Sequence, residues 1–454
     1  MKKMNKFFAI LLCIGMLASI ISACAGGNNN ETTGASSNAQ GGQQQEGGSD
    51  GPQPLKIHYL TSKLLSDGAV QTIMDLAEQY KQQVNPNFEL EVESISDRPA
   101  YLQKIKILAS ANELPDWFDA DPEPFFEGIA EKGLVVNIDD VYKEIGVTDK
   151  FFKVSIDYPR LDDGSLYLMT WNANAEYFWY NKELFEQAGV SAPTTFDEFL
   201  AISETLKSKG ITPISVHGKD FWPLLRYMAF IPFRMEGNDY LDKLRKGEAK
   251  MADPAGMKAA EFIQKLGQNY FNEGWSNADY NTSLELFLSG KTAMYYIGTW
   301  QVKDMIDENM NLKENFGYFK MPQYSASDKT KVSDFFANSG IGTAIRQDAY
   351  NEEMKNFLQF LFDNYADTAL YKYHVIPSVQ PTIKDDLSQI YKDMLKDISE
   401  VETYTKVWDV RLDPETNESI GRESTNLALG LSTPEEFAKR MDDAIAQNAP
   451  KYFK

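Results

Sequence analysis

The sequence of 454 residues has little cysteine and little histidine. It contains two Cys and three His. Two cysteines cannot build a disulfide framework, and three histidines provide little material for a His-rich metal site. No spacing of histidines, thiols or serines matches a catalytic motif. We therefore expect no metal site, no cofactor and no catalytic residue.

The sequence also lacks an excess of basic residues. Its 45 Lys and Arg stand against 66 Asp and Glu, which gives a formal net charge of −21. A nucleic-acid-binding protein needs a basic face for the phosphates, so we expect no nucleic-acid partner. A hydrophobic content of 43% with 13% aromatic residues excludes a disordered chain, and the length predicts roughly two or three domains.

A long apolar run is found only near the start of the sequence. Three lysines precede the apolar residues 7–17, and Ile-Ser-Ala-Cys follows at 21–24. This order of charge, apolar run and small residues is typical of a signal peptide. The segment 21–24 also resembles a bacterial lipobox, which implies that residues 1–23 are removed and that Cys24 is lipidated. A simple membrane anchor and an unlipidated secreted protein are the alternatives.

The next segment is polar and of low complexity. Residues 25–54 consist mainly of Gly, Asn, Gln, Ser and Thr and include no aromatic residue. Such a composition cannot bury enough apolar surface to offset its ordering entropy, which predicts a flexible linker over residues 24–54. No later run reaches the ~18 apolar residues of a transmembrane helix. We expect a folded body outside the cell, held at the membrane by lipid.

The body has the pattern of an α/β protein. Apolar residues alternate at 55–60 and 88–92, as in strands, and recur at helical spacing at 70–84 and 101–108. A short aromatic strand then ends in acidic residues at 115–121. Strands that alternate with helices predict a mainly parallel sheet. Other local signals predict a hairpin turn at Asp163-Gly164 and helix starts at Thr195 and Thr433.

Five sequence blocks carry a resemblance to a known family. They are residues 108–116 (LASANELPD), 130–140, 180–199 with 210–214, 287–300 (FLSGKTAM to GTW) and 430–437. Together and in this order they resemble extracellular solute-binding protein family 1, the maltose-binding-protein-like sugar receptors of ABC importers. Each block alone is a weak signal, whereas the set covers nearly the whole body.

The resemblance implies a two-lobed α/β fold of the periplasmic-binding-protein type II. Such a fold has mixed sheets flanked by helices and a ligand cleft between the lobes. By analogy, the first lobe would hold residues 55–168 plus 300–363, and the second would hold 169–299 plus 364–454. The hinge would lie near 167–170. Two lobes that close on a small ligand can bury most of its surface.

A pyranose offers hydroxyl groups and an apolar C–H face, so its receptor needs aromatic rings that can stack on this face. Trp222 follows a predicted strand at 213–216, and ligands of open α/β sheets collect at the carboxyl ends of strands. Trp300 stands at a Gly-x-Trp position that resembles a common ligand contact of the family. Trp171, just past the expected hinge, is a third candidate. The alternative for each ring is packing within a lobe, which we expect for Trp117 and Trp179.

Polar side chains are the candidates for hydrogen bonds to the hydroxyl groups of the sugar. Asp119 and Asp121 end the aromatic strand, where the resemblance implies hydroxyl-binding residues; the alternative is a pair of solvated loop carboxylates. Arg226, one helical turn beyond Trp222, could pair with an acidic sugar or brace the cleft. The remaining candidates are Lys63, which follows the first strand, and Asn338, which precedes a predicted strand at 341–345.

The resemblance implies a receptor rather than an enzyme. The protein would be lipid-anchored on the outer face of a bacterial membrane, capture a carbohydrate (an oligosaccharide) and deliver it to an ABC permease. The ATPase would be a separate chain, because Glu285 stands where the phosphate-binding loop motif requires Gly. A monomer is the simplest expectation.

Three other functions remain open at this point. A secreted glycoside hydrolase needs only two suitably separated carboxylates, which a count of acidic residues does not exclude. A receptor of the same fold could bind a peptide, a metal or a polyamine. A sensor could present its closed form to a membrane kinase.

Overall fold

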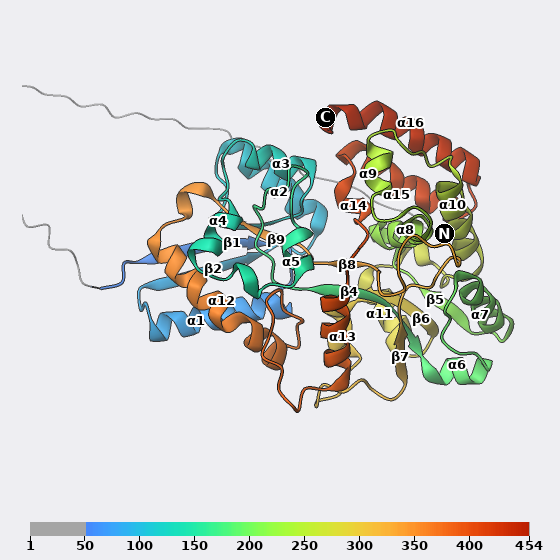
Figure 1. The fold of residues 1–454 in the computed structure, drawn as a ribbon, viewed down its shortest axis with the longest axis horizontal. Coiled ribbons are helices and arrows are strands. Elements are labelled where there is room, and N and C mark those ends of the chain that lie inside the picture. The colour runs from blue at the N-terminus through green and yellow to red at the C-terminus, as the bar shows by residue number, and fades with distance from the viewer. Residues whose placement is uncertain (1–50, 454) are drawn as a thin grey trace, which may run out of the picture. The chain divides into compact units, whose positions relative to one another are not determined.

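Two β-sheets, each with its own helices, organise the part of the chain that the structure describes, residues 51–453 of a computed structural model (Figure 1). The predicted signal peptide, Cys24 and the linker up to residue 50 lie outside these residues. No helix of the described residues is both long enough and apolar enough to cross a membrane.

The first sheet has the strand order β2-β1-β3-β9. β1 pairs in parallel with both β2 and β3, as the alternation of strands and helices predicts, and β9 returns antiparallel to β3. The bounds of this lobe's strands and helices are β1 (Leu55–Thr61), α1 (Gly68–Gln83), β2 (Phe88–Ser94), α2 (Arg98–Ala111), β3 (Trp117–Ala120), α3 (Pro124–Ala130), α4 (Ile138–Glu144), α5 (Lys153–Asp157), β9 (Gly342–Ile345) and α12 (Glu352–Tyr373).

Helices cover both faces of the first sheet. Adjacent residues of a strand point to opposite faces, so Trp117 packs in one apolar cluster and Phe118 in another. The cluster around Trp117 includes side chains of α1 and α12, and the cluster around Phe118 includes side chains of α2 and α3. Covering both faces buries the strands and leaves their carboxyl ends as the accessible edge.

The second sheet has the order β5-β6-β4-β7, with β8 paired to β4. β4 is antiparallel to β6, β7 and β8, while β5 runs parallel to β6, so this sheet is mixed. The bounds of this lobe's elements are β4 (Asn174–Asn181), α6 (Lys182–Ala188), α7 (Phe196–Ser208), β5 (Thr212–Ser215), α8 (Trp222–Glu236), α9 (Tyr240–Arg245), α10 (Pro254–Asn269), α11 (Tyr280–Leu288), β6 (Thr292–Gly298), β7 (Phe316–Phe319), β8 (Ala337–Asn338), α13 (Gln389–Glu400), α14 (Trp408–Arg411), α15 (Pro414–Ala428) and α16 (Pro434–Tyr452).

Three chain segments cross between the two sheets, and they are bonded to one another. Met169 and Thr343 exchange backbone hydrogen bonds of 2.9 and 2.8 Å. Further along, Asn172 bridges Pro377 and Asn174 pairs with Asn338. The crossings therefore lie at about 169–174, 338–342 and 374–379, and the first of them overlaps the expected hinge at 167–170.

One part of the expected lobe boundary differs from the structure. The segment 300–363 was expected to return to the first lobe as a whole, yet β7 lies within it and pairs with β4 of the second sheet. The cause is aromatic packing, since Phe319 stacks on Phe178 of β4 with ring centroids 5.0 Å apart. The chain re-enters the first sheet only at β9, and α12 continues past residue 363 to Tyr373.

Local sequence signals agree with the structure where they depend only on neighbouring residues. Complete capping boxes begin α7 at Thr195 and α16 at Thr433, as predicted. At Asp163-Gly164 the chain does turn, with the Leu161 amide donating to the Ser165 carbonyl at 3.0 Å, but no strand flanks the turn. The hairpin prediction is therefore correct for the turn and wrong for its strands.

Candidate functional site

Two tryptophans from distant parts of the sequence meet at one edge of the second sheet. Trp222 is the first residue of α8, and Trp300 follows β6 in a short 3-10 helix. Their ring centroids are 6.4 Å apart at an interplanar angle of 62°. The Trp300 ring lies directly on the backbone of Gly298, where an added Cβ would overlap it, and its Nε1 donates to the Tyr280 hydroxyl at 3.2 Å. We call Trp222, Trp300 and Tyr280 the aromatic corner.

The orientation of Trp222 is set by the residue before it. Phe221 has a φ of 61°, an uncommon conformation for a non-glycine residue, and it caps the start of α8. Its ring rests on Gly421 of α15, where a Cβ would approach Cγ to 2.9 Å. Packing on α15 thus holds the strained turn that brings Trp222 to the corner.

A buried histidine supports the corner from behind. The ring of His217 lies 4.9 Å from Trp222 and 5.1 Å from Tyr280, between centroids. Burial lowers the pKa of His217 to about 3, so its imidazole is neutral at physiological pH. We therefore place His217 among the residues that position the aromatic rings.

A buried ion network lies one turn further along α8. The Nε of Arg226 donates to both carboxylate oxygens of Glu176 at 3.2 Å, and one of its terminal nitrogens contacts Asp409. Glu176 also accepts from the side-chain amide of Asn338 at 2.9 Å. Burial alone would lower the pKa of Arg226, but Asp409 and Glu176 raise it above its ordinary value.

In the first lobe, Asp119 is enclosed by hydrogen-bond donors. Its side chain is buried, with 1% of the residue exposed, and it joins the ends of β1, β3 and β9. Both carboxylate oxygens are occupied, which makes Asp119 a structural junction. The donors are Tyr59 (2.9 Å), Thr61 (2.7 Å), the Ser62 amide (2.9 Å), Lys63 (3.4 Å) and Thr343 (3.0 Å).

Asp121 stands at the boundary between the lobes. It forms an ion pair with Arg98, which also donates to the Ser62 hydroxyl at 3.3 Å. Burial raises the pKa of Asp121, the Arg98 charge opposes this rise, and the Asp409 carboxylate of the second lobe adds to it. The charge of a second-lobe carboxylate thus acts on Asp121.

Further polar contacts join the lobes beside this pair. Arg411 of α14 donates to the carbonyl oxygens of Tyr158 at 2.5 Å and Arg160 at 3.0 Å. Arg245 of α9 lies 3.0 Å from an Asp162 carboxylate oxygen, and Arg411 lies 3.9 Å from the other. In Figure 1, α14 lies in the second lobe on the side that faces the first.

A small pocket opens next to Trp300 and is lined by both lobes. Its first-lobe side begins at the N-cap residue of α1, Asp67, whose carboxylate accepts from two backbone amides at 3.0 and 3.2 Å. The full lining is Asp67, Gly68, Asn172, Asn174, Trp300, Lys303, Tyr373, His374, Val375 and Ile376. The aromatic corner therefore borders an interlobe space.

The described architecture and its interlobe site match a known family. The family model of bacterial extracellular solute-binding proteins matches residues 66–366, which include parts of both lobes. The chain belongs to this family.

Relatives with curated descriptions agree with this assignment. An uncharacterised ABC transporter extracellular-binding protein of Pyrococcus horikoshii is 23% identical over 370 residues, covering 80% of this chain and 77% of the relative. The multiple sugar-binding protein of Streptococcus mutans is 23% identical over 291 residues, covering 59% and 62%. A probable sugar-binding periplasmic protein of Rhizobium meliloti is 27% identical over 216 residues, covering 46% and 50%.

Solved structures show the fold of this solute-binding protein. A chitin oligosaccharide binding protein superposes with a TM-score of 0.75 at 21% identity, covering 87% of this chain and 99% of that one. A binding protein in complex with raffinose gives 0.66 at 17% identity, covering 87% and 99%. The predicted two-lobed α/β fold of the periplasmic-binding-protein type is confirmed.

The solute-binding protein brings most of the candidate residues into two groups. Trp222, Trp300, Arg226 and Asn338 surround one edge of the second sheet, and Asn338 reaches this group through Glu176. A facing group in the first lobe contains Lys63, Asp119 and Asp121, where Lys63 donates to Asp119 and to the Ile341 carbonyl at 3.1 Å. The involvement of these residues in ligand binding stays a prediction.

Trp171 lies elsewhere, in the core of the first lobe. It is 1% exposed, its Nε1 donates to the Thr343 hydroxyl at 2.8 Å, and its ring stacks on Phe362 at 5.6 Å. Such burial leaves no ring face for a ligand, so we leave Trp171 out of the proposed site. Trp117 and Trp179 are also buried, as expected.

Sequence reasoning missed three residues of the site, Glu176, Asp409 and Tyr280. Glu176 had a usable signal, because it is the one charged residue in the apolar strand Asn174–Asn181, and a buried charge needs a partner. Asp409 and Tyr280 gave no comparable signal in the sequence. Both reach the site through tertiary contacts, Asp409 with Arg226 and Tyr280 with Trp300.

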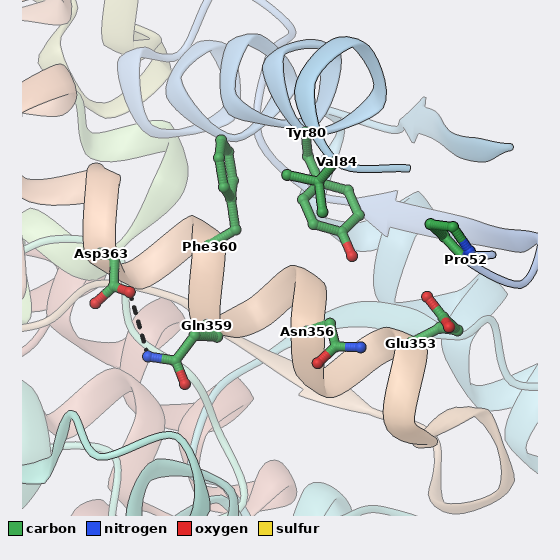
Figure 2. A pocket seen from close by; sticks show the side chains of 8 residues that line it. All are labelled: Pro52, Tyr80, Val84, Glu353, Asn356, Gln359, Phe360 and Asp363. Carbon is green, nitrogen blue, oxygen red and sulfur yellow. Dashed lines mark hydrogen bonds between the residues drawn. The ribbon is translucent and has the colours of Figure 1, made fainter. Parts of the chain in front are cut away.

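A separate pocket on the first lobe contains none of the candidate residues (Figure 2). Tyr80 of α1 and Val84, the residue directly after this helix, face a row of polar side chains on α12 across it. Its lining is Pro52, Tyr80, Val84, Glu353, Asn356, Gln359, Phe360 and Asp363. Because all these residues belong to one lobe, movement of the lobes would not enclose a ligand there.

Proposed function

We propose that this solute-binding protein captures a carbohydrate between its lobes and delivers it to an ABC permease. The observation that carries the proposal is the aromatic corner, where Trp222 and Trp300 meet at 6.4 Å beside a space that both lobes line. Tryptophan rings match the apolar C–H faces of a pyranose. Both rings are half-buried, which leaves part of each available to a ligand.

Acidic side chains near the corner supply acceptors for hydroxyl groups. Asp409 keeps 24% of its side chain exposed while it is bonded to Arg226, and Asp67 borders the pocket beside Trp300. Hydrogen bonds to a carboxylate are stronger than those between neutral groups. A sugar placed against the rings would therefore find charged acceptors on both lobes.

Lobe movement would couple capture to delivery. Three bonded segments connect the lobes, and backbone rotation in these few residues can change the angle between two rigid bodies. A ligand that contacts both lobes stabilises the closed form over the open one. A permease that binds the closed form would then receive loaded protein, with ATP hydrolysed by a separate chain.

The names of several relatives support an oligosaccharide as the ligand. Relatives in Streptococcus mutans and Rhizobium meliloti are described as sugar-binding, and structural neighbours are described as binding chitin oligosaccharide and raffinose. We carry over the class, an oligosaccharide, and none of the individual sugars. We also propose that the protein releases its ligand unchanged and acts as a monomer.

A lipid anchor completes the proposal. Cys24 follows Ile-Ser-Ala at the end of the predicted signal peptide, and thioether lipidation at this residue would hold the protein on the outer face of the membrane. Expression of the full chain and of Cys24→Ser in a bacterial host, followed by membrane fractionation, tests this part. The full chain should sediment with membranes and Cys24→Ser should not; sedimentation of both would refute lipidation at Cys24.

A thermal-shift screen tests the carbohydrate assignment. A ligand that binds only the folded protein raises its melting temperature. Chito-, xylo-, malto- and raffinose-type oligosaccharides should include at least one that raises the melting temperature in a saturable manner. Reducing ends are measured in the same samples, and their increase would show that the protein is a glycoside hydrolase. A screen without any saturable shift would reject a carbohydrate ligand.

A further inference from the structure

The cationic side chains around the interlobe site are held by carboxylates. Arg226 is bonded to Glu176 and Asp409, Arg98 is paired with Asp121, and Lys63 donates to Asp119. The three carboxylates Asp119, Asp121 and Glu176 are themselves buried. The charges of these cations are therefore neutralised within the protein.

A fourth cation, Lys303, lies beside the aromatic corner. Lys303 is exposed and borders the small interlobe pocket, and Asp67 lines the same pocket from the first lobe. Four cationic residues thus share the site with five carboxylates, Asp67, Asp119, Asp121, Glu176 and Asp409. Arg98, Arg226 and Lys63 thus present no uncompensated positive charge to a ligand.

An anionic sugar would meet two penalties in such a site. Its carboxylate would lose hydration on entering the space between the lobes, and it would approach Asp121 and Asp409, whose arginines are already paired. It could gain Arg98 or Arg226 only by displacing Asp121 or Asp409 from its ion pair. Displacing Asp121 leaves a buried protein carboxylate unpaired, and displacing Asp409 breaks the network that holds Arg226; both changes are unfavourable.

We propose that the interlobe site discriminates against anionic saccharides, and that Asp121 and Asp409 are the specificity-determining residues because they neutralise Arg98 and Arg226. This inference rests on the proposed carbohydrate-binding function and specifies its substrate class. A neutral oligosaccharide keeps the stacking and the hydroxyl hydrogen bonds without disturbing either ion pair. Arg226, an early candidate for pairing with an acidic sugar, therefore acts as a brace.

Isothermal titration with matched saccharides measures this preference. The probes are xylotriose and xylotriose substituted with glucuronic acid, and cellotriose and cellotriose oxidised to the carboxylate at its C6 positions. If one of these pairs binds to the protein, its neutral sugar should bind more tightly than its acidic sugar by roughly tenfold or more. Equal or tighter binding of the acidic member would overturn the inference and leave the carbohydrate assignment intact.

Two substitutions assign the preference to the named residues. Asp121→Asn removes the carboxylate paired with Arg98, and Asp409→Asn removes one of the two carboxylates that hold Arg226. Each should reduce the preference for the neutral sugar by roughly threefold or more. Asp443→Asn, on the exposed surface of α16, makes the same change of charge outside the site and should leave the preference unchanged. Asp409 keeps 24% of its side chain exposed, so we expect Asp409→Asn to fold. This variant carries the test if Asp121→Asn does not fold.

The outcomes separate the inference from the function on which it rests. An unchanged preference in a folded Asp409→Asn variant would overturn the role of the ion pairs. If no saccharide binds the wild-type protein, the proposed function fails and the inference fails with it. The inference is supported if the wild type prefers neutral sugars and Asp443→Asn keeps this preference. Asp121→Asn and Asp409→Asn must also weaken it.

Discussion

The guanidinium carbon of Arg226 lies 5.1 Å from the centroid of the Trp222 ring, one turn further along α8. The same guanidinium is bonded to Glu176 and Asp409. The ring proposed to stack on the ligand is therefore backed by the ion network of the site. This contact connects ligand affinity with the stability of the second lobe.

Removal of either ring of the aromatic corner should weaken sugar binding. Trp222→Ala and Trp300→Ala each lose stacking and apolar burial, which corresponds to ~1–3 kcal/mol of binding free energy. Titration calorimetry with the sugar found in the screen measures this loss. Tyr452→Ala, which removes an aromatic ring from the far helix α16, should bind normally. Wild-type affinity in both Trp variants would contradict the location of the site.

Removal of Arg226 should destabilise the folded protein. Arg226→Met leaves Glu176 buried without its cation, and breaking a buried ion pair from one side costs about 3–5 kcal/mol. Urea unfolding measures the change. Lys439→Met is the control, because it breaks an ion pair with Asp443 in which both side chains are exposed. Equal urea midpoints for the two variants would show that the buried network contributes little to stability.

The pH dependence of stability should contain a contribution from Glu123. Burial, with a further contribution from Asp121, raises the pKa of Glu123 from 4.5 to about 7. The folded protein then binds the proton more tightly than the unfolded chain. This group therefore makes stability fall as the pH rises from about 4.5 to about 7.

The substitution Glu123→Gln removes that contribution. After a discount for partial solvent exposure of the half-buried residue, the variant should be more stable than the wild type by about 1 kcal/mol at pH 8 and nearly equal near pH 4. Urea unfolding at both pH values makes the comparison, with the exposed Glu418→Gln as control. A variant that is less stable than the wild type at pH 8 would contradict a raised pKa for Glu123.

Asp162 should influence the distance between the lobes. Its carboxylate lies 3.0 Å from Arg245 and 3.9 Å from Arg411, both of the second lobe. Asp162→Asn should weaken sugar binding by about 1 kcal/mol, or roughly fivefold, because the closed form loses this attraction. Small-angle scattering should show a larger radius of gyration for the variant with sugar bound. Identical scattering and affinity would show that the contact does not stabilise closure.

Features that depend on neighbouring residues could be predicted from the sequence. The order of β1, α1, β2, α2 and β3 follows from apolar spacing, and the capping boxes at Thr195 and Thr433 follow from residues three positions apart. Trp222 could be selected because its place after a strand depends on local order alone. The family resemblance supplied the two-lobed arrangement.

Features that depend on tertiary partners could not be predicted in this way. Arg226 and Glu176 are 50 positions apart and Arg226 and Asp409 are 183 apart, so no local pattern joins them. The burial of Trp171 depends on α12, which contributes Phe362 from a distant part of the chain. In the same way, the sequence of the short strand β7 does not indicate which of the two sheets the strand joins.

Titration of the sugar identified by the screen into wild-type protein and into a Trp222→Ala/Trp300→Ala double variant tests the central claim most directly. We predict saturable binding of one sugar per wild-type protein and a loss of at least one order of magnitude in affinity for the double variant, with both proteins showing cooperative thermal unfolding. Binding that is unchanged in the folded double variant would contradict an interlobe sugar site at the aromatic corner.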